Sequence, residues 1–553
     1  MRRSFSYFNR SDNLIEMAKA KLDILVIGGG ITGAGIALDA ASRGLRVGLV
    51  EKQDFCAGTS SRSTKLIHGG LRYLKQGDVK LVREVGQERA ILYRNAPHIV
   101  IPERMLLPLV KRGTYGKFGT SIGLWVYDIL AGVKKEERRR MLTSEETERI
   151  EGALRKDILK GGGLYIEYRT DDARLNIEVL KTASSYGALC ANYTEATQFL
   201  YKDNKIIGCK VKDIINNSSF EIHARKIINA TGPWVDQLRK KGNCEHKKRL
   251  HLTKGVHLVV PYQRFPLSQA IYFDVYDGRM IFAIPRDDIT YIGTTDTDYN
   301  GVIENPKVTK EDVHYLLDAV NYMFPQIKLT EKDIASSWAG LRPLIHEEGK
   351  STSEISRKDE IFHSISGLIS IAGGKLTGYR KMAERVVDLV IEEFKKEDDY
   401  KYKPCYTDKI VLSGGDFSLP NEIPKFIENI YESAKSIGIN KKQIASIVSK
   451  YGTNTTKIID KANQLFAEVK THQLEFLLLV AELQYTVEEE MVTNLSDFFS
   501  RRTGRIFFER PNLEKTYLLL SEEMKKLYNW NESQKNYYVG QFENELFAAV
   551  NFD

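Results

Sequence analysis

Short apolar runs recur through most of the chain, separated by glycine-rich turns or helix-like stretches. The run at residues 24–27 leads through a glycine turn into a helix-like stretch that ends near Arg43, and a second run follows at 46–50. A strand, a helix and a second strand in this order are typical of a parallel α/β sheet. This stretch therefore predicts a strand–helix–strand unit near the N-terminus.

Four further apolar runs follow one another closely in the middle of the chain, at residues 255–260, 270–275, 280–284 and 290–294. Runs of this length that are separated only by turn residues predict an antiparallel sheet. We therefore expect a second sheet in addition to the parallel one.

The first of these runs carries one titratable side chain. Alternation places Val256, Leu258 and Val260 on one side of the strand, and His257 and Val259 on the other. A buried histidine is commonly a core residue bonded to a backbone carbonyl, whereas a histidine that faces a site can act as a base. The strand pattern leaves both interpretations of His257 open.

After about residue 405 the pattern becomes helical. Residues that share one face of a helix near the end of the chain are Met491, Val492, Leu495, Phe498 and Phe499. We expect these side chains to belong to a core. The sequence contains no internal repeat and no low-complexity tract.

Composition narrows the class of protein. A chain of 553 residues predicts two or three domains. Its five cysteines lack CxxC spacing, which argues against a disulfide framework or zinc site and suits a reducing cytosol. No apolar run approaches the ~18 residues of a membrane-spanning helix, and the N-terminal stretch lacks the apolar segment of a signal peptide. The net charge of +8 permits an anionic substrate or membrane surface, and no nucleic-acid-binding module is recognised.

The turn after the first strand has the GxGxxG pattern of a dinucleotide site. Gly28 allows the tight turn, Gly30 lets a pyrophosphate approach the backbone, and Gly33 lets the helix pack on the strand. The helix N-terminus offers unpaired N–H groups to phosphates. Glu51, at the end of the second strand, is placed to accept hydrogen bonds from a ribose diol.

Two later segments indicate FAD rather than NAD. Residues 224–236 form an apolar strand that runs into Ala230-Thr231-Gly232, and residues 368–390 form another strand, glycine turn and helix. The start of that helix could direct N–H groups at the flavin pyrimidine, where reduction accumulates negative charge. The Ser-, Thr- and Gly-rich loop at 56–74 could run along a pyrophosphate and ribityl chain. A nicotinamide enzyme would not need dinucleotide-domain pieces spread so widely.

Several motifs occur in the order of a known family: "GGGITGAGIALDAASRG", "GTSSRSTKLIHGGLRYL", "ATGPWVD", "KGVHLVVP", "IGTTDTDY", "AGLRPL" and "AGGKLTGYRK". Together they resemble the FAD-dependent glycerol-3-phosphate dehydrogenases of the aerobic, quinone-linked kind. The resemblance covers roughly residues 20–395, and "EEEMVTNLSDFFSRRT" resembles the family's C-terminal cap motif.

The resemblance implies an α/β (α+β) fold: a glutathione-reductase-like FAD domain interleaved with a mixed-sheet substrate domain, plus a C-terminal helical domain. The expected segments are 20–100, 150–250 and 360–395 for the FAD domain, 101–149 and 251–359 for the substrate domain, and 405–553 for the helical cap domain.

The resemblance also gives His257 a role. Oxidation of a secondary alcohol removes the hydroxyl proton and sends the hydride on carbon to flavin N5, so it needs a base of near-neutral pKa. In the resembling enzymes the histidine of "KGxH" lies over the flavin and is proposed as that base, which here is His257. His68 in "IHGG" is the rival, and could instead contact or tune the flavin.

A phosphate dianion in the substrate requires fixed cations, and the planar fork of arginine suits it best. The family pattern points to Arg342, Arg72 and Arg357, with Tyr73 adding a hydroxyl and Lys375 reaching substrate oxygen and the flavin C2 carbonyl. We expect His257, Lys375 and Arg342 to act in catalysis. An isolated arginine can equally form a surface ion pair, and Arg357 lies in the most polar surroundings.

The expected FAD-binding residues come from the three dinucleotide segments, and no metal ligand is expected. They are Gly28, Gly30, Gly33, Glu51, Thr59, Ser60, Ser61, Lys65, His68, Gly70, Ala230, Gly232, Gly374, Lys375, Leu376 and Thr377.

The electron acceptor is the open part of this prediction. The family's dehydrogenases are peripheral membrane proteins that reduce quinone, which implies a cytoplasmic protein at the inner face of the cell membrane. Residues 111–140 place Trp125, Tyr127 and Leu130 between basic clusters. This segment could lie on an anionic bilayer or be a solvated basic helix. A homodimer is a further option that the sequence does not decide.

Other classes stay open. Some relatives are oxidases that use oxygen and carry an insertion in mid-chain; no such insertion is obvious here. An FAD-dependent amine or amino-acid oxidase shares the fold, but its substrate would not need several arginines. A flavoprotein without turnover would need neither the base nor the cations.

Overall fold

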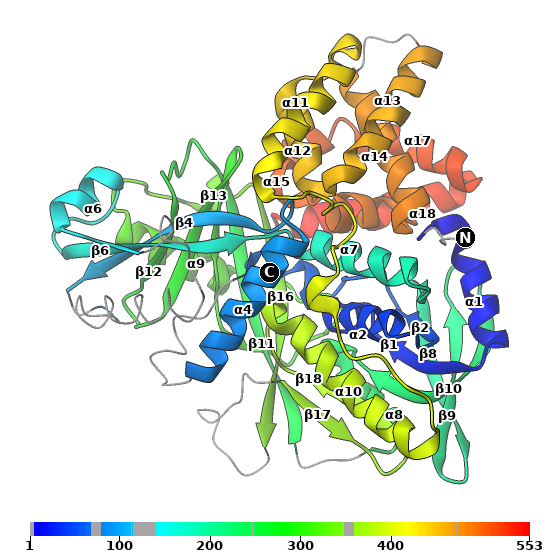
Figure 1. Ribbon diagram of the computed structural model, residues 1–553. Helices are drawn as coiled ribbons and strands as arrows, with labels where there is room; N and C mark the ends of the chain where they lie inside the picture. The colour runs from blue at the N-terminus through cyan, green and yellow to red at the C-terminus, as the bar shows by residue number, and fades with distance from the viewer. Residues whose placement is uncertain are drawn as a thin grey trace.

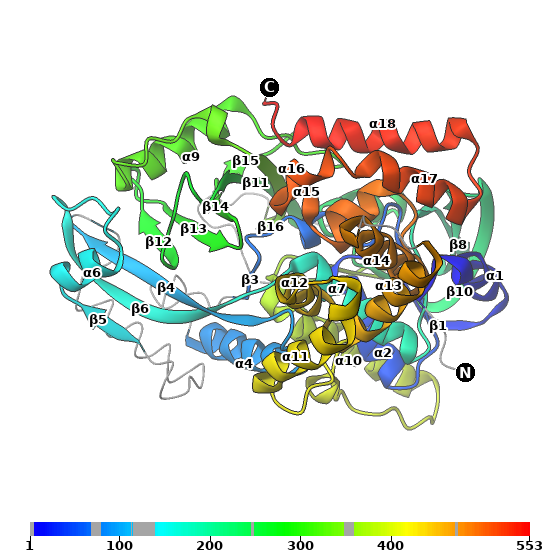
Figure 2. The same cartoon turned by 90° about the horizontal axis from the view of Figure 1, so that it is seen from above.

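A computed structural model describes residues 5–67, 79–111, 113, 139–244, 248–347, 359–469 and 474–552. Two sheets and a helical domain organise these residues (Figure 1). Seen from above, the long strands of the second sheet extend away from the parallel sheet, and the C-terminal helices cover the junction (Figure 2).

The first sheet has the strand order β17-β18-β10-β1-β2-β7, with β8 and β9 joined to it through β10. Strands β18, β10, β1, β2 and β7 run parallel, and β17 is antiparallel. The strands are β1 (Leu22–Ile27), β2 (Val47–Val50), β7 (Leu189–Ala191), β8 (Thr194–Lys202), β9 (Lys205–Asp213), β10 (Ser218–Asn229), β17 (Glu360–His363) and β18 (Leu368–Ala372).

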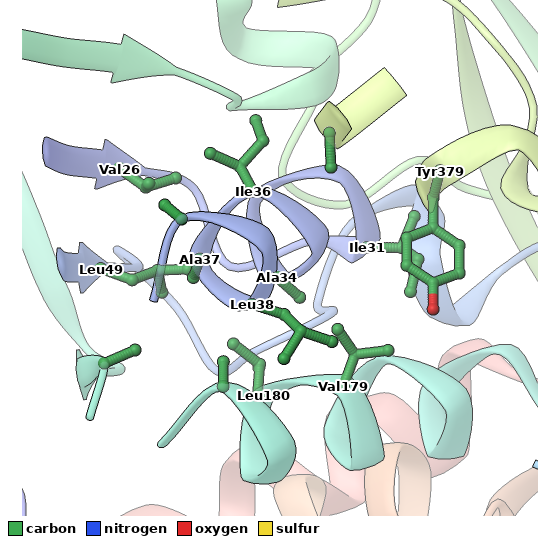
Figure 3. Packing of buried hydrophobic residues seen from close by; sticks show 14 of the residues in the cluster. Val26, Ile31, Ala34, Ile36, Ala37, Leu38, Leu49, Val179, Leu180 and Tyr379 are labelled. Carbon is green, nitrogen blue, oxygen red and sulfur yellow. The ribbon is translucent and has the colours of Figure 1, made fainter. Parts of the chain in front are cut away.

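Helices cover this sheet because its strands are apolar on both faces. Helix α2 (Ile31–Ser42) lies between strands β1 and β2, which supply Val26 and Leu49, and helix α7 (Asp172–Ser185), which supplies Val179 and Leu180 (Figure 3). Among the described residues before the C-terminal domain, the other α-helices are α1 (Arg10–Lys19), α4 (Val79–Asn95), α6 (Ser144–Ile150), α8 (Val235–Lys241), α9 (Lys310–Met323) and α10 (Tyr379–Glu397).

The second sheet has the order β15-β11-β14-β13-β12-β4-β6-β3, with β16 paired to β11 and β5 to β6. Its pairs are antiparallel except β12 with β4. The strands are β3 (Leu66–Ile67), β4 (Ile101–Val110), β5 (Arg140–Leu142), β6 (Leu159–Arg169), β11 (Lys248–Pro261), β12 (Ala270–Asp274), β13 (Met280–Arg286), β14 (Ile289–Gly293), β15 (Thr297–Asp298) and β16 (Ser336–Glu347).

The four predicted strand runs correspond to β11, β12, β13 and β14. The predicted alternation in β11 is confirmed: Val256, Leu258 and Val260 pack in the core shared with α9, and Val259 packs in the core under the C-terminal helices. Strand β11 begins at Lys248, earlier than expected, because β16 pairs with it along its length from Glu347 to Ser336. Strands β3 and β6 also pair in the second sheet, although their residues fall within segments expected for the FAD domain.

The last part of the chain is helical, as predicted. Its helices are α11 (Ile423–Ala434), α12 (Lys441–Tyr451), α13 (Thr455–Val469), α14 (Leu474–Glu490), α15 (Arg505–Phe508), α16 (Arg510–Leu513), α17 (Tyr517–Tyr528) and α18 (Glu532–Ala548). They are the yellow-to-red helices of Figure 1, and they lie over α7 and α2.

The prediction that residues 491–499 lie on one face of a single helix is wrong. Helix α14 ends at Glu490, residues 491–494 are not helical, and a π-helical turn spans Asp497–Arg502. Met491 has a φ of +54°, and the Asp497 carboxylate accepts hydrogen bonds from the backbone N–H and hydroxyl of Thr493, at 2.9 and 2.6 Å. These local bonds replace helical ones and break the helix. The five apolar side chains are still fully buried, so their expected place in a core is confirmed.

Candidate active site and dinucleotide cavity

A cavity of about 250 Å³ lies at the carboxyl ends of β1, β10 and β18. In parallel α/β sheets this edge is the usual place for a ligand. Ten of the predicted cofactor residues line it: Gly28, Gly30, Glu51, Thr59, Ser60, Ala230, Gly232, Gly374, Lys375 and Leu376.

The glycine turn forms one wall of this cavity. Gly28 has a φ of +115°, and a Cβ there would lie 2.5 Å from the carbonyl oxygen of Ala230. A Cβ on Gly33 would overlap the carbonyl oxygen of Gly28, so helix α2 can approach β1 only because residue 33 is glycine. Gly30 is the N-cap of α2 and leaves bare backbone facing the cavity. The bare turn and the helix N-terminus fit a pyrophosphate.

Glu51 closes another side of the cavity. Its two carboxylate oxygens accept hydrogen bonds from the backbone N–H groups of Gly29 and Gln53, at 2.7 and 2.9 Å. Burial raises the pKa of Glu51, and these two N–H groups oppose the rise. Each carboxylate oxygen retains accepting capacity, so this side chain fits a ribose diol while it holds the loop that follows β2.

The third dinucleotide segment follows β18. Gly373 and Gly374 have φ values of +78° and +80°, in the left-handed region that glycine tolerates. Lys375 then precedes a short 3₁₀ turn that runs into α10. A strand, glycine turn and helix start are therefore present here, as the sequence indicates.

The predicted residues Lys65, Ser61 and Thr377 stand behind the cavity wall rather than on it. The Lys65 ammonium is buried, donates to Asp172 Oδ1 at 2.5 Å and to the Ser61 carbonyl at 3.1 Å. Because Asp172 lines the cavity, Lys65 orients a wall residue instead of facing the cavity itself.

His257 is buried, with 2% of its surface exposed. Its ring stacks on Trp338 with centroids 4.7 Å apart and planes 11° from parallel. Nε2 lies 3.0 Å from the Thr64 hydroxyl, whereas Nδ1 contacts no hydrogen-bonding partner among the described residues. Burial, reinforced by Arg342 and Lys65, holds the pKa of His257 well below its ordinary value. The ring is therefore neutral at physiological pH, and its lowered pKa makes it a weaker base than the near-neutral one that the reaction calls for.

Arg342 lies on the same face of the sheet as His257. The register pairs His257 with Trp338, Gly255 with Gly340, and Thr253 with Arg342, and directly opposed residues share a face. Two glycines thus separate the histidine from the arginine. A Cβ on Gly255 would lie 2.6 Å from Arg342 Nη2, so the guanidinium extends over bare backbone.

Three residues that follow β14 orient the Arg342 guanidinium. Nη1 donates to the Thr295 carbonyl at 3.2 Å and to Asp296 Oδ1 at 3.0 Å, and Nη2 donates to the Thr294 hydroxyl at 3.1 Å. The side chain is 30% exposed. The guanidinium is therefore partly exposed to solvent, and the loop after β14 holds it in place.

Several predicted residues lie outside the described part of the chain: His68, Gly70, Arg72, Tyr73 and Arg357, together with the apolar and aromatic residues Trp125, Tyr127 and Leu130 of the basic segment. In the part that the structure does describe, no three His, Cys, Asp or Glu side chains are grouped to hold a metal. Nor does any described helix combine the length and apolar character needed to cross a bilayer.

Sequence reasoning missed the partners that orient the site. Trp338 and Thr64 hold the His257 ring, and Asp172 holds Lys65. Only the pairing of β11 with β16 brings Trp338 to His257. The register follows from two distant segments, so no local pattern could have found it.

Comparison with known proteins is consistent with these features. The model of the FAD dependent oxidoreductase family matches residues 23–380, and that of the C-terminal domain of alpha-glycerophosphate oxidase matches residues 405–535. The strand order, the glycine turn and the cavity, together with this match, make the chain an FAD-dependent oxidoreductase.

The relatives are more specific. The chain is 51% identical over 551 residues to an aerobic glycerol-3-phosphate dehydrogenase of Bacillus subtilis, with 100% of this chain and 99% of that one covered. It is 49% identical to one from Staphylococcus haemolyticus, covering 99% and 97%. The crystal structure of the glycerol-3-phosphate dehydrogenase from Bacillus halodurans complexed with FAD superimposes with a TM-score of 0.85, at 45% identity and 99% coverage of both chains. The chain belongs to the aerobic glycerol-3-phosphate dehydrogenase family.

Proposed function

We propose that this protein oxidises sn-glycerol 3-phosphate to dihydroxyacetone phosphate and passes the electrons to a membrane quinone. The observation that carries the proposal is the shared face of β11 and β16, where the neutral His257 and the cation Arg342 stand on either side of two glycines. A base and a phosphate-binding cation in one row suit a substrate with a carbinol and a phosphate close together.

His257 is the proposed base. In the tautomer whose Nε2–H donates to the Thr64 hydroxyl, Nδ1 carries the lone pair and has no hydrogen-bonding partner among the described residues. Because Nδ1 is buried, the proposal requires the substrate hydroxyl to reach this atom on binding, where it would give up its proton. Stacking on Trp338 fixes the ring plane during that transfer. When bound, FAD supplies an acceptor for the hydride that leaves the same carbon.

Arg342 is the proposed anchor of the phosphate. Asp296 and the Thr294 hydroxyl fix the guanidinium before substrate arrives, which reduces the ordering required on binding. Lys375, at the cavity wall, is proposed to contact substrate oxygen and flavin. The roles of Arg72, Tyr73 and Arg357 in phosphate binding, and of His68 near the flavin, remain proposals drawn from the family pattern.

The cofactor roles follow the same logic. Gly28, Gly30 and the N-terminus of α2 are proposed to hold the pyrophosphate, and Glu51 the adenosine ribose. Thr59, Ser60, Ala230, Gly232, Gly374 and Leu376 also line the cavity.

The test uses purified protein and exclusion of oxygen. Addition of sn-glycerol 3-phosphate should bleach the visible flavin absorbance, whereas glycerol, which lacks the phosphate, should bleach it far more slowly. Bleaching by a D- or L-amino acid, and none by glycerol 3-phosphate, would replace this proposal with an amino-acid oxidase.

The acceptor is tested on the reduced protein. Reoxidation should be fast with a quinone in anionic lipid vesicles and slow with dissolved oxygen. Fast reoxidation by oxygen with stoichiometric peroxide would make the protein an oxidase, and equal rates with and without vesicles would remove the membrane from the proposal.

A further inference from the structure

The loop after β2 is held from behind by a buried carboxylate. Glu51, Gln53 and Cys56 of this loop line the dinucleotide cavity, whereas Asp54 does not. Asp54 is buried, with 1% of its surface exposed. The Cys56 N–H donates to the Gly29 carbonyl at 3.2 Å, so the loop is also tied to the glycine turn. Whatever fixes Asp54 therefore fixes this wall of the cavity.

Two arginines of the C-terminal domain bind Asp54. Arg502 forms a two-pronged pair, with Nη1 2.8 Å from Oδ2 and Nη2 2.9 Å from Oδ1. Arg501 Nε donates to Oδ2 at 2.8 Å. Asn192, at the end of β7, donates to Oδ1 at 3.0 Å. All of these side chains are buried or nearly so, and the arginines are more than 400 residues from Asp54 in the sequence.

Arg502 is itself fixed at the break after α14. Its Nε and Nη2 donate to the Glu490 carbonyl, at 3.1 and 2.9 Å, at the C-terminal end of the helix. The Glu490 side chain binds α7 through Arg174 and Lys181, at 2.5 and 3.1 Å. The start of α7 supplies Asp172, another residue of the cavity wall. Arg502 and Glu490 of the helical domain thus contact two segments that line the cavity, the loop after β2 and the start of α7.

We propose that Arg502, with Arg501, is a positioning residue of the FAD site: the C-terminal domain braces the Glu51–Cys56 loop through Asp54 and so sets the affinity for the dinucleotide. This inference depends on the dinucleotide site and not on the identity of the substrate.

The buried Asp54–Arg502 pair is better suited to positioning the loop than to stabilising the fold, because such a pair supplies little net stability. A buried ion pair loses hydration of both charges, and replacing it with apolar groups is often neutral for stability. Its geometry, however, is directional, because the two N–H groups of the guanidinium fork fit the two oxygens of one carboxylate. Asp54 is thereby held in one place, and the backbone N–H of Gln53, the side chain of Glu51 and Gly29 are held with it.

The experiment compares FAD affinity with stability in the full chain. Arg502→Met, Arg502→Lys, Asp54→Asn and the double variant Asp54→Asn/Arg502→Met are freed of FAD, and binding of FAD and of ADP is measured by titration. We expect the single variants Arg502→Met and Asp54→Asn to bind both ligands about ten- to a hundredfold more weakly, the range seen when the groups behind metal ligands are removed. Arg502→Lys should retain part of the affinity because it keeps the charge but loses the fork.

The double variant separates positioning from stability. It removes the charges of Asp54 and Arg502 together, and Arg501 keeps its pair with Asp497 at 2.7 Å. Its unfolding temperature should therefore recover relative to the single variants, while its affinity for FAD should stay low because the loop is still unbraced. Arg505→Met is the matched control: Arg505 binds Glu482 at 2.6 Å and Glu509 at 3.0 Å, all within the helical domain. It should lower the unfolding temperature and leave FAD affinity unchanged.

Two results would overturn the proposal. One is wild-type affinity for FAD and ADP in Arg502→Met and Asp54→Asn, with only stability reduced. The other is a loss of affinity in Arg505→Met equal to that in Arg502→Met, since this would mean that any damage to the helical domain weakens the site. If a single variant does not fold, the double variant and Arg502→Lys still give the comparison.

Discussion

At the scale of single residues, the site depends on environments that change ordinary side chains. His257 is a strand residue in a valine-rich run, yet Trp338, Thr64 and burial make it a fixed, neutral ring. Arg342 could have been a surface cation, but the loop after β14 holds it in one orientation.

The His257→Gln variant tests the base. It should retain FAD and reduce the rate of flavin reduction by glycerol 3-phosphate about 10²–10⁴-fold, as measured by anaerobic stopped flow. Since the pKa of His257 lies well below its ordinary value, the wild-type rate should not fall as pH is lowered from 8 to 6.5. A full rate in the variant would return His257 to the role of a core histidine and favour His68.

Substitutions of Arg342 test the substrate anchor. Arg342→Lys keeps the charge but loses the planar fork, so kcat/KM for glycerol 3-phosphate should fall. The fall should correspond to a loss of a few kcal/mol or less of transition-state stabilisation. Arg342→Ala should cost more and should reduce the preference for glycerol 3-phosphate over glycerol. If turnover of both substrates falls equally in the alanine variant, Arg342 does not bind the phosphate, and Arg72, Arg357 or Lys375 takes its place.

His98, which lies outside the site, gives a pH dependence of stability of the same sign as that expected for the buried His257. It is buried at 1% exposure, and burial, with Arg174 and Lys181 adding to the effect, lowers its pKa to about 3. The unfolded chain takes up a proton near pH 6.5, and the folded one does not. Because of this residue, the free energy of unfolding should therefore fall by about 1.4 kcal/mol for each pH unit below 6.5.

Denaturant unfolding between pH 7 and pH 5 measures this slope. The comparison with wild type uses only the change in the free energy of unfolding with pH. Between pH 7 and pH 5 this free energy should fall less in the His98→Gln variant. Parallel slopes would mean that His98 is protonated in the folded protein.

At the scale of elements, the contact of α2 with β1 decides whether the dinucleotide turn can form. A Cβ on Gly33 would overlap the Gly28 carbonyl oxygen, whereas one on Gly540 in α18 would meet no atom within 4 Å. Gly33→Ala should therefore push the helix from the strand, lower the free energy of unfolding by about 1–3 kcal/mol, and weaken FAD binding.

Gly540→Ala is the matched control for this substitution. It should be neutral or stabilising by up to about 1 kcal/mol, because alanine favours the helix. Thermal unfolding with and without added FAD measures both effects. Unchanged FAD binding in Gly33→Ala would show that the turn tolerates a shifted helix.

At the scale of the whole molecule, buried charges join the helical domain to the FAD domain. Glu490 is fully buried between Arg174 and Lys181 of α7. Burial alone would raise its pKa, but these two cations lower the pKa of Glu490 to about 2. The contact therefore keeps its charge throughout the physiological range of pH.

Glu490→Gln should leave two buried cations less well paired and lower the free energy of unfolding by about 3–5 kcal/mol. The adjacent Glu489 pairs with Lys457 at 2.9 Å at the surface, and Glu489→Gln should change stability by about 0.5 kcal/mol or less. Chemical denaturation gives both values. Similar small effects in the two variants would contradict a stabilising role for the interdomain network.

What the sequence determined by itself was mostly local. The turn at Gly28, Gly30 and Gly33, the acid at Glu51, the strand–glycine–helix after residue 368 and the alternation in β11 each follow from neighbouring residues. Local patterns also predicted a buried core near residue 495, although hydrogen bonds between Thr493 and Asp497 broke the helix expected there.

Only the tertiary structure decided which distant residues support these local features. The pairing of β11 with β16 puts Trp338 beside His257 and Arg342 in the same row. The docking of the helical domain puts Arg502 on Asp54. Strand register and domain packing are set by the shared burial of segments far apart in the chain, and that free energy is not encoded in any short stretch of sequence.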